Sequence, residues 1–192
     1  MEANRQNRAV FLDKDGTLME DIPYNSDPKR FVFSPGVVDG LGLLAQAGFR
    51  LVIVSNQSGV ARGHFDVSAL LPMEERLREM FSAEGLVLDG IYWCPHFPGG
   101  ANPQFGIPCS CRKPAPGMIF KAGTDLCLDL KGSWMIGDRE SDVQSAHNAG
   151  CHSAFLHNIV DKEIDPLPDL VSTTFLDLAR KIVSHTIETL PL

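Results

Sequence analysis

The strongest structural signal in this chain is the segment Ala9-Val10-Phe11-Leu12-Asp13-Lys14-Asp15-Gly16-Thr17-Leu18. Four apolar residues lead directly into two aspartates, which predicts a buried strand with carboxylates at its C-terminal end. In extended backbone Asp13 and Asp15 point to one side and Lys14 points to the other. Gly16 then permits a sharp turn. Two carboxylates this close repel each other, which favours a divalent metal site, an acid–base site or both. A strand that ends in a polar turn is the alternative.

Length and composition indicate an ordinary globular protein. The chain has 192 residues, of which 44% are hydrophobic and 21% charged, and we expect a single domain over residues 1–192. The formal net charge of −7 argues against nucleic-acid and anionic-membrane partners. The polar residues 1–8 lead into an apolar run that is too short for a signal peptide or a membrane span. We therefore expect a cytoplasmic protein, and a monomer.

Strands and helices are expected to alternate after this segment. Apolar runs predict strands, and apolar residues at helical spacing predict helices. Such an order gives right-handed crossovers between parallel strands, so we expect an α/β fold, a Rossmann-like three-layer sandwich with a mainly parallel central sheet and no separate cap domain. Pro72 should kink its helix or mark its first turn, and Pro166 and Pro168 should lie in a surface loop. The expected strands are residues 9–12, 49–54, 86–93, 132–136 and 151–156, and the expected helices are residues 36–46, 66–85, 115–130, 142–149 and from about 173 onward.

The second strand also runs into polar residues, Ser55-Asn56-Gln57-Ser58-Gly59. Open parallel sheets bind their ligands at the carboxyl ends of the strands. Hydroxyl and amide groups at such a position can hydrogen-bond phosphate oxygens, and Arg62 adds a cation nearby. An ordinary polar loop is the alternative.

Two later segments add charges at comparable positions. Lys113 precedes prolines at a helix entrance, where it could meet a phosphoryl group as a point charge. A surface basic pair with Arg112 is the alternative. Asp138 ends the fourth strand as Asp13 ends the first, and Asp142 follows it within reach of the same centre. A turn with a helix N-cap would also explain Asp138.

Three of the cysteines cluster with one histidine. Cys94-Pro95-His96 and Cys109-Ser110-Cys111 bound a loop rich in proline and glycine. Two close pairs of soft ligands predict a closed tetrahedral zinc site, which is structural because four protein ligands leave no position for water. Four unrelated residues are the alternative. The expected Zn²⁺ ligands are Cys94, His96, Cys109 and Cys111, in a loop of residues 94–111, whereas Cys127 and Cys151 are expected in the core.

The segments around Asp13, Ser55, Lys113 and Asp138 resemble, in this order, the four motifs of the haloacid dehalogenase (HAD) superfamily. The Cys/His loop just before Arg112 makes the chain similar to the subfamily that contains the D-glycero-D-manno-heptose 1,7-bisphosphate 7-phosphatases and the histidinol-phosphate phosphatases. The resemblance extends over nearly the whole chain. It implies a phosphomonoester hydrolase that works through an aspartyl-phosphate intermediate.

The resemblance also implies roles for individual residues. Asp13 would attack phosphorus, and Asp15 would protonate the departing oxygen and later deprotonate the attacking water. Ser55, Asn56 and Lys113 would hold the phosphoryl oxygens.

A catalytic Mg²⁺ is implied by the same resemblance. Its ligands would be a carboxylate oxygen of Asp13, the backbone carbonyl of Asp15, and Asp138. Asp142 would lie next to these ligands without binding the ion itself.

The substrate expected from the resemblance is a small phosphorylated sugar. We favour heptose 1,7-bisphosphate, whose 7-phosphate would be removed on the route to nucleotide-activated heptose for the lipopolysaccharide core. A second phosphate requires further cations, and Arg62, Arg112 and Arg139 lie on three loops that should converge above Asp13. Further candidate substrate-binding residues are Asp21, Tyr24, Asn56, Gln57 and Ser58.

Three alternatives stay open at this point. Histidinol phosphate carries an amine, which a carboxylate of Glu20, Asp21 or Asp66 could bind. A module that accepts or binds phosphate without turnover would use a similar sheet, but it would gain nothing from Asp15. A zinc-dependent nucleic-acid binder is disfavoured by the acidic charge of the chain.

Overall fold

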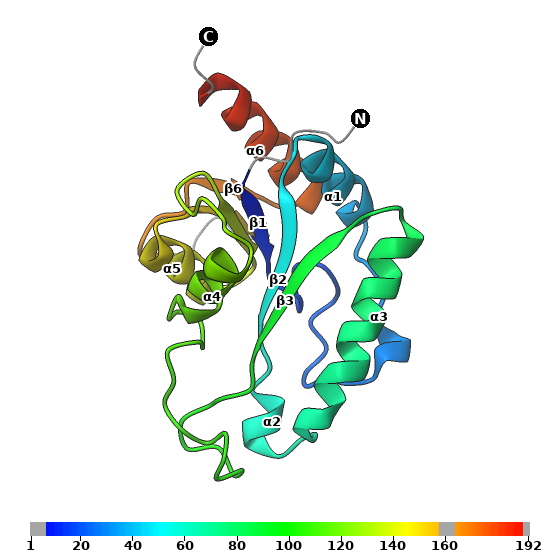
Figure 1. The fold of residues 1–192 in the computed structure, drawn as a ribbon, viewed down its shortest axis with the longest axis vertical. Helices are drawn as coiled ribbons and strands as arrows, with labels where there is room; N and C mark the ends of the chain where they lie inside the picture. The colour runs from blue at the N-terminus through cyan, green and yellow to red at the C-terminus, as the bar shows by residue number, and fades with distance from the viewer. Residues whose placement is uncertain (1–6, 158–163, 190–192) are drawn as a thin grey trace.

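A six-stranded parallel sheet forms the centre of the structure, a computed structural model that describes residues 7–157 and 164–189 (Figure 1). The strand order is β3-β2-β1-β4-β5-β6, and each pairing between neighbours is parallel. The α/β fold with a mainly parallel sheet is thereby confirmed. The strands are β1 (Ala9–Leu12), β2 (Arg50–Asn56), β3 (Leu88–Cys94), β4 (Trp134–Gly137), β5 (His152–Leu156) and β6 (Leu170–Ser172).

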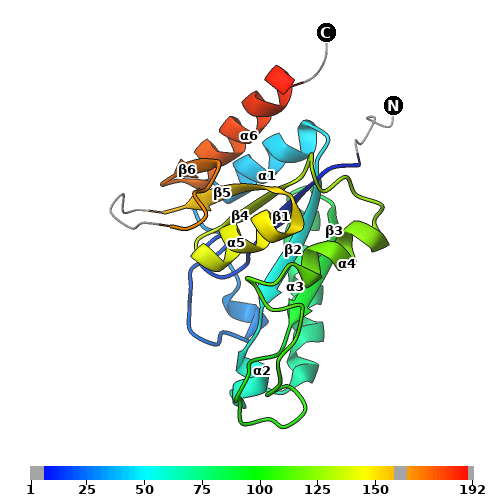
Figure 2. The same cartoon turned by 90° about the vertical axis from the view of Figure 1, so that its left-hand side faces the viewer.

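Helices cover both faces of the sheet, which gives three layers (Figure 2). One hydrophobic cluster joins the sheet to α1, α3 and α6, and a second joins the opposite face to α4 and α5. α1 and α6 also pack against each other. The helices are α1 (Val37–Gln46), α2 (Gly59–Arg62), α3 (Leu70–Ala83), α4 (Gly117–Asp125), α5 (Glu140–Ala149) and α6 (Phe175–Thr189).

The apolar run of β1 explains why this strand is central. Val10 and Leu12 belong to the first hydrophobic cluster, and Ala9 and Phe11 belong to the second. All four side chains are fully buried, as expected for a parallel strand that is covered on both faces. β1 lies between β2 and β4, so the carboxyl ends of these three strands form one edge where ligands can bind.

Three connections extend beyond this edge (Figure 1). Residues 13–36 contain one short 3-10 helix, Pro28–Arg30. Residues 57–69 contain α2 and a second 3-10 helix, Val67–Ala69. Residues 95–116 form a long loop between β3 and α4 without a helix or strand.

Several expected elements differ from those observed. α4 ends at Asp125 rather than at residue 130, and Cys127 follows in the left-handed region with φ of 52°. Cys127 is exposed, so its expected place in the core is wrong, whereas Cys151 is buried. β6 falls where a surface loop was expected.

The expectation for Pro72 agrees with the structure. Pro72 lies in the first turn of α3, where a proline costs no helical hydrogen bond. None of the helices within the described residues combines the length and the apolarity that are needed to cross a membrane.

Candidate active site

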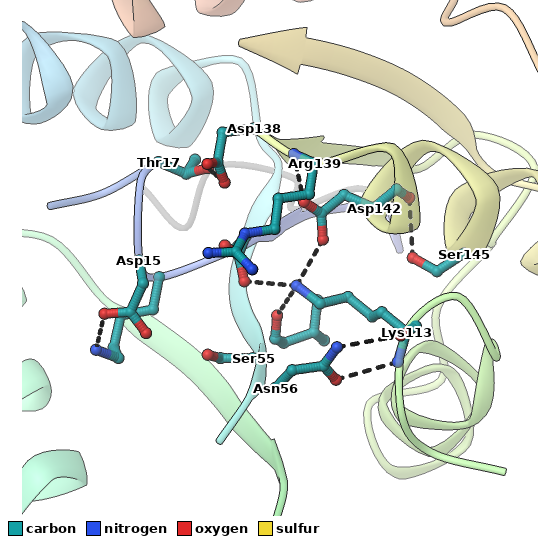
Figure 3. A network of polar contacts seen from close by, with 12 residues as sticks. Asp15, Thr17, Ser55, Asn56, Lys113, Asp138, Arg139, Asp142 and Ser145 are labelled. Atoms are coloured by element: carbon teal, nitrogen blue, oxygen red, sulfur yellow. Dashed lines mark hydrogen bonds and ion pairs between the residues drawn. The ribbon is translucent and has the colours of Figure 1, made fainter. Parts of the chain in front are cut away.

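Lys113 lies at the centre of a buried polar network (Figure 3). Its Nζ is 2.5 Å from Asp13 Oδ1 and 2.7 Å from Asp142 Oδ1, and it donates a 2.9 Å hydrogen bond to the carbonyl of Val54. One ammonium thus joins the end of β1, strand β2 and helix α5. Burial alone would lower the pKa of Lys113, but the carboxylates of Asp13 and Asp142 raise it above its ordinary value. The side chain is therefore a permanent cation.

Asp13, Asp138 and Asp142 bring three carboxyl groups to the same place. One oxygen from each lies within 4.8 Å of the others. Burial, reinforced by repulsion from the neighbouring carboxylates, raises the pKa of Asp138 to about 7. Burial also raises the pKa of Asp142 to about 6, although Lys113 opposes the rise. Such a cluster favours the binding of a cation.

Both oxygens of Asp142 already have partners. Oδ1 faces Lys113, and Oδ2 accepts a 3.0 Å hydrogen bond from the backbone N–H of Arg139 at the start of α5. Asp138 is freer, because among the side chains of the described residues it accepts only a long 3.4 Å hydrogen bond, from the hydroxyl of Thr17 to its Oδ1. The arrangement suits Asp138 as a direct ligand and Asp142 as the anchor of Lys113.

Two glycines let these carboxylates approach so closely. Gly16 has φ of +86°, and a Cβ there would lie 2.2 Å from Oδ2 of Asp138. A Cβ at Gly137 would lie 2.3 Å from Oδ2 of Asp142. Any side chain at either position would displace a carboxyl group, so Gly16 is needed for space as well as for its turn.

Asp15 lies opposite the carboxylate cluster and lines the cavity described below. Lys14 makes an ion pair with its Oδ1, and Gln57 donates a 3.1 Å hydrogen bond to its Oδ2. Burial raises the pKa of Asp15, and Lys14 partly offsets the rise. The expectation that Lys14 points away from Asp15 is wrong, because β1 ends at Leu12 and the alternation of an extended strand stops there.

Asn56 lines the cavity, and both polar atoms of its side-chain amide bond to the backbone of Lys113. Its Nδ2 donates to the carbonyl of Lys113 and its Oδ1 accepts from the N–H of Lys113, both at 3.1 Å. This pairing fixes the backbone of Lys113, and the expected contact of Asn56 with phosphoryl oxygens stays a prediction. The hydroxyl of Ser55 accepts a 2.9 Å hydrogen bond from Gln57 Nε2 and is free to donate.

A cavity of about 370 Å³ opens above Asp13. Its lining includes every residue that the sequence suggested for catalysis or for binding of the phosphorylated sugar, whereas the expected magnesium ligand Asp138 lies outside it. Of the carboxylates considered for a substrate amine, only Asp21 lines the cavity, and Asp21 pairs with Arg139 at 2.7 Å. The sequence-derived candidates in the lining are Asp13, Asp15, Asp21, Tyr24, Ser55, Asn56, Gln57, Ser58, Arg62, Arg112, Lys113, Arg139 and Asp142.

The three arginines do converge on this cavity. Two of them make cation–π contacts with Phe97, which lies in the loop after β3. The guanidinium carbons of Arg62 and Arg112 lie 3.6 and 5.0 Å from the centroid of its ring. Burial lowers the pKa of Arg112, and repulsion from Arg62 and Arg139 adds to the effect. Three guanidinium groups that repel one another favour an anion between them. Sequence reasoning did not single out Phe97, although an aromatic next to a basic pair is the signal for such stacking.

The Cys/His residues of the long loop lie together as expected. Their ligand atoms all lie within 4.8 Å of one another. The Cys94 sulfur is 3.6 Å from that of Cys109 and 3.1 Å from that of Cys111, and Nδ1 of His96 is 3.4 Å from the Cys111 sulfur. Ligands placed tetrahedrally around one zinc ion lie about 3.5–3.8 Å apart. The cluster therefore has nearly the size of a zinc site, and it contains no disulfide.

Comparison with known proteins places these features in a family. A HAD-hydrolase-like family model matches residues 110–178. The chain is 39% identical over 177 residues to the D-glycero-beta-D-manno-heptose-1,7-bisphosphate 7-phosphatase of Yersinia pestis, covering 91% of this chain and 94% of that protein. It is 37% identical over 177 residues to the protein of the same name from Escherichia coli K12, covering 91% and 93%.

A solved structure agrees with these relatives. The D,D-heptose 1,7-bisphosphate phosphatase from B. bronchiseptica, crystallised with magnesium and phosphate, has a TM-score of 0.78 and 29% identity, and the match covers 93% of this chain and 99% of that one. The chain belongs to the family of the D-glycero-beta-D-manno-heptose-1,7-bisphosphate 7-phosphatases, within the HAD-like hydrolases.

Proposed function

We propose that this chain is a magnesium-dependent phosphatase that removes the 7-phosphate of D-glycero-D-manno-heptose 1,7-bisphosphate through an aspartyl-phosphate intermediate. The observation that carries the proposal is the convergence of Asp13, Asp15 and Lys113 in one cavity that three arginines also line. The names of the relatives support this substrate. Because those names specify the β anomer, we expect that anomer to be preferred.

The donor set fits magnesium. Asp13 and Asp138 supply carboxylate oxygens, the ligands that Mg²⁺ prefers, and the backbone carbonyl of Asp15 is the third candidate. The raised pKa of Asp138 reflects negative charge that a cation would balance. When bound, magnesium supplies the positive charge that lets a phosphate approach Asp13.

In the first displacement, residues of this chain supply the nucleophile and the proton. Lys113 holds Oδ1 of Asp13, so the other carboxylate oxygen is the one that attacks phosphorus. As the P–O bond to the sugar breaks, Asp15 gives its proton to the departing oxygen. The products of this step are the aspartyl phosphate on Asp13 and the ionised carboxylate of Asp15.

The second displacement reverses the role of Asp15. Its carboxylate takes a proton from a water molecule as that water attacks the phosphorus of the aspartyl phosphate. Asp13 leaves as a carboxylate and inorganic phosphate forms. In both steps the hydroxyl of Ser55 would donate a hydrogen bond to a phosphoryl oxygen, and the charge of Lys113 would stabilise the phosphoryl group.

The arginines would bind the distal phosphate. Arg62 and Arg112 lie on Phe97, and Arg139 is tethered to Asp21. Arginine suits this task because its planar fork can make paired hydrogen bonds to phosphate. An amine of histidinol phosphate would instead meet these cations, with Asp21 already paired, so histidinol phosphate is the weaker candidate.

We also propose a structural zinc ion at Cys94, His96, Cys109 and Cys111. Thiolate and imidazole ligands suit zinc, and the loop of residues 94–111 has few apolar residues to hold it. Since this loop contains Phe97, zinc would fix the surface that carries Arg62 and Arg112. We further propose that the chain acts in the cytoplasm as a monomeric single domain.

The experiment that tests this function compares kcat/KM for both heptose 1,7-bisphosphate anomers, fructose 1,6-bisphosphate and histidinol phosphate. We expect a heptose bisphosphate to be preferred by at least tenfold, about 1.4 kcal/mol of transition-state stabilisation. A tenfold preference for histidinol phosphate would assign the chain to the other activity. Absence of turnover with bound Mg²⁺ would favour a phosphate-binding module.

A further inference from the structure

Lys14 is a buried lysine that the proposed reaction does not use. Its side chain is 0% exposed, which is rare for lysine because burial of an ammonium is costly unless the charge is paired. Its Nζ contacts Oδ1 of Asp15 and lies 4.7 Å from the ring centroid of Phe31. The ammonium therefore has one carboxylate and one aromatic face to offset its loss of water.

Asp15 is held at both of its oxygens. Lys14 binds Oδ1, and Nε2 of Gln57 donates to Oδ2 at 3.1 Å. The same Nε2 lies 2.9 Å from the hydroxyl of Ser55, and Gln57 is only 5% exposed. Two fixed contacts on opposite oxygens determine the plane of the carboxyl group, since a single contact would leave it free to rotate.

The two contacts are not equivalent for proton transfer. The oxygen that accepts a hydrogen bond from the ammonium cannot also hold a proton directed at that ammonium, so in the acid form it is the carbonyl oxygen. The proton of the acid form then lies on Oδ2, which can accept from the Gln57 amide and still donate. A proton on Oδ1 would point at the ammonium of Lys14, which would repel it.

We infer that Lys14 is a positioning residue for the acid–base step, because it fixes Oδ1 of Asp15 and makes Oδ2 the oxygen that exchanges the proton. The inference rests on the proposed function. In the first displacement Oδ2 transfers its proton to the sugar oxygen while the P–O bond breaks. In the second, Oδ2 accepts a proton from the water that attacks phosphorus, which restores the starting acid.

The test compares two substrates that differ in their need for an acid. p-Nitrophenyl phosphate has a leaving group that departs without protonation, whereas heptose 1,7-bisphosphate has an alkoxide that needs a proton. Lys14→Met keeps much of the volume and removes the charge, and Lys14→Arg keeps the charge. Lys121→Met is the matched control, because Lys121 is exposed on α4 and pairs only with Asp125 among the ion pairs of the described residues.

For Lys14→Met we expect kcat/KM on the heptose bisphosphate to fall about 10- to 100-fold and kcat/KM on p-nitrophenyl phosphate to fall less than about threefold. This ratio covers the steps up to release of the leaving group, so it excludes hydrolysis of the aspartyl phosphate that the two substrates share. Lys14→Arg should recover part of the loss, and Lys121→Met should match the parent. An equal loss of kcat/KM on both substrates, or no loss, would overturn the inference.

Folding of the variants is checked by thermal unfolding, and Lys14→Gln provides a second neutral replacement. If neither Lys14→Met nor Lys14→Gln folds, the lysine is structural and the inference is wrong. Failure of the proposed function gives a different result, since the parent chain with Mg²⁺ would then turn over neither substrate or would prefer histidinol phosphate by tenfold.

Discussion

The carboxylate cluster should make the magnesium-free protein less stable as the pH rises. The pKa of Asp138 is raised from 3.8 to about 7. Below about pH 4 the carboxyl group is neutral in both the folded and the unfolded chain, so burial carries no penalty. Between pH 4 and pH 7 the unfolded chain releases the proton more readily, and stability is lost as the pH passes through the folded pKa. A difference of this size corresponds to on the order of 4 kcal/mol at pH 8.

The variant Asp138→Asn isolates this contribution. We expect it to be more stable than the parent at pH 8 by up to a few kcal/mol and similar to the parent at pH 4, because asparagine has no charge to bury. Mg²⁺ should stabilise the parent increasingly between pH 5 and pH 8, since protons compete with the metal, and it should stabilise the variant little.

The assay is denaturant unfolding at several pH values, with and without Mg²⁺. Dialysis without a chelator removes magnesium and leaves tightly bound zinc in place, so the loop of residues 94–111 is not perturbed. A difference between the parent and Asp138→Asn that is independent of pH would refute the reasoning. So would an equal gain in stability for both proteins when Mg²⁺ is added.

Three further predictions concern the acid, the distal phosphate and the zinc loop. Asp15→Asn should lower kcat far more for a sugar phosphate than for p-nitrophenyl phosphate, and an equal loss on both would argue against its role as an acid. Arg62→Ala and Arg112→Ala should each reduce kcat/KM for the bisphosphate about tenfold or more, while kcat/KM for a simple monophosphate changes little. Equal losses on both substrates would mean that these arginines do not bind the distal phosphate. Metal analysis of protein purified without added zinc should find one zinc per chain. Cys109→Ser should lower that zinc content and raise KM while the sheet stays folded. Active, folded protein free of zinc would contradict the zinc assignment.

The sequence predicted the features that depend on local pattern. The apolar run before Asp13 required a strand buried on both faces, and the alternation of strands and helices required parallel order. Polar residues at the ends of β1, β2 and β4 then had to meet at one edge of the sheet. The cavity lined by Asp13, Ser55 and Lys113 follows from this arrangement.

Features that depend on long side chains or on distant partners could not be predicted in this way. Strand alternation gives the direction of a Cβ, but the four-carbon chain of Lys14 turns back to Asp15 once the strand has ended. The amide of Asn56 is paired with the backbone of Lys113, which no local pattern reveals. β6 has three residues that are at least partly exposed, so it lacks the apolar run that marks a buried strand.

The most direct test of the central claim is the activity of Asp13→Asn on heptose 1,7-bisphosphate. This change keeps the volume of the side chain and removes the anion that attacks phosphorus. Asp39→Asn is the matched control, because Asp39 is exposed in the first turn of α1, away from the cavity. We predict that kcat of Asp13→Asn falls by at least about a thousandfold, with folding and zinc content intact, while the control keeps parental activity. Hydrolysis by Asp13→Asn at the parental rate would contradict the account.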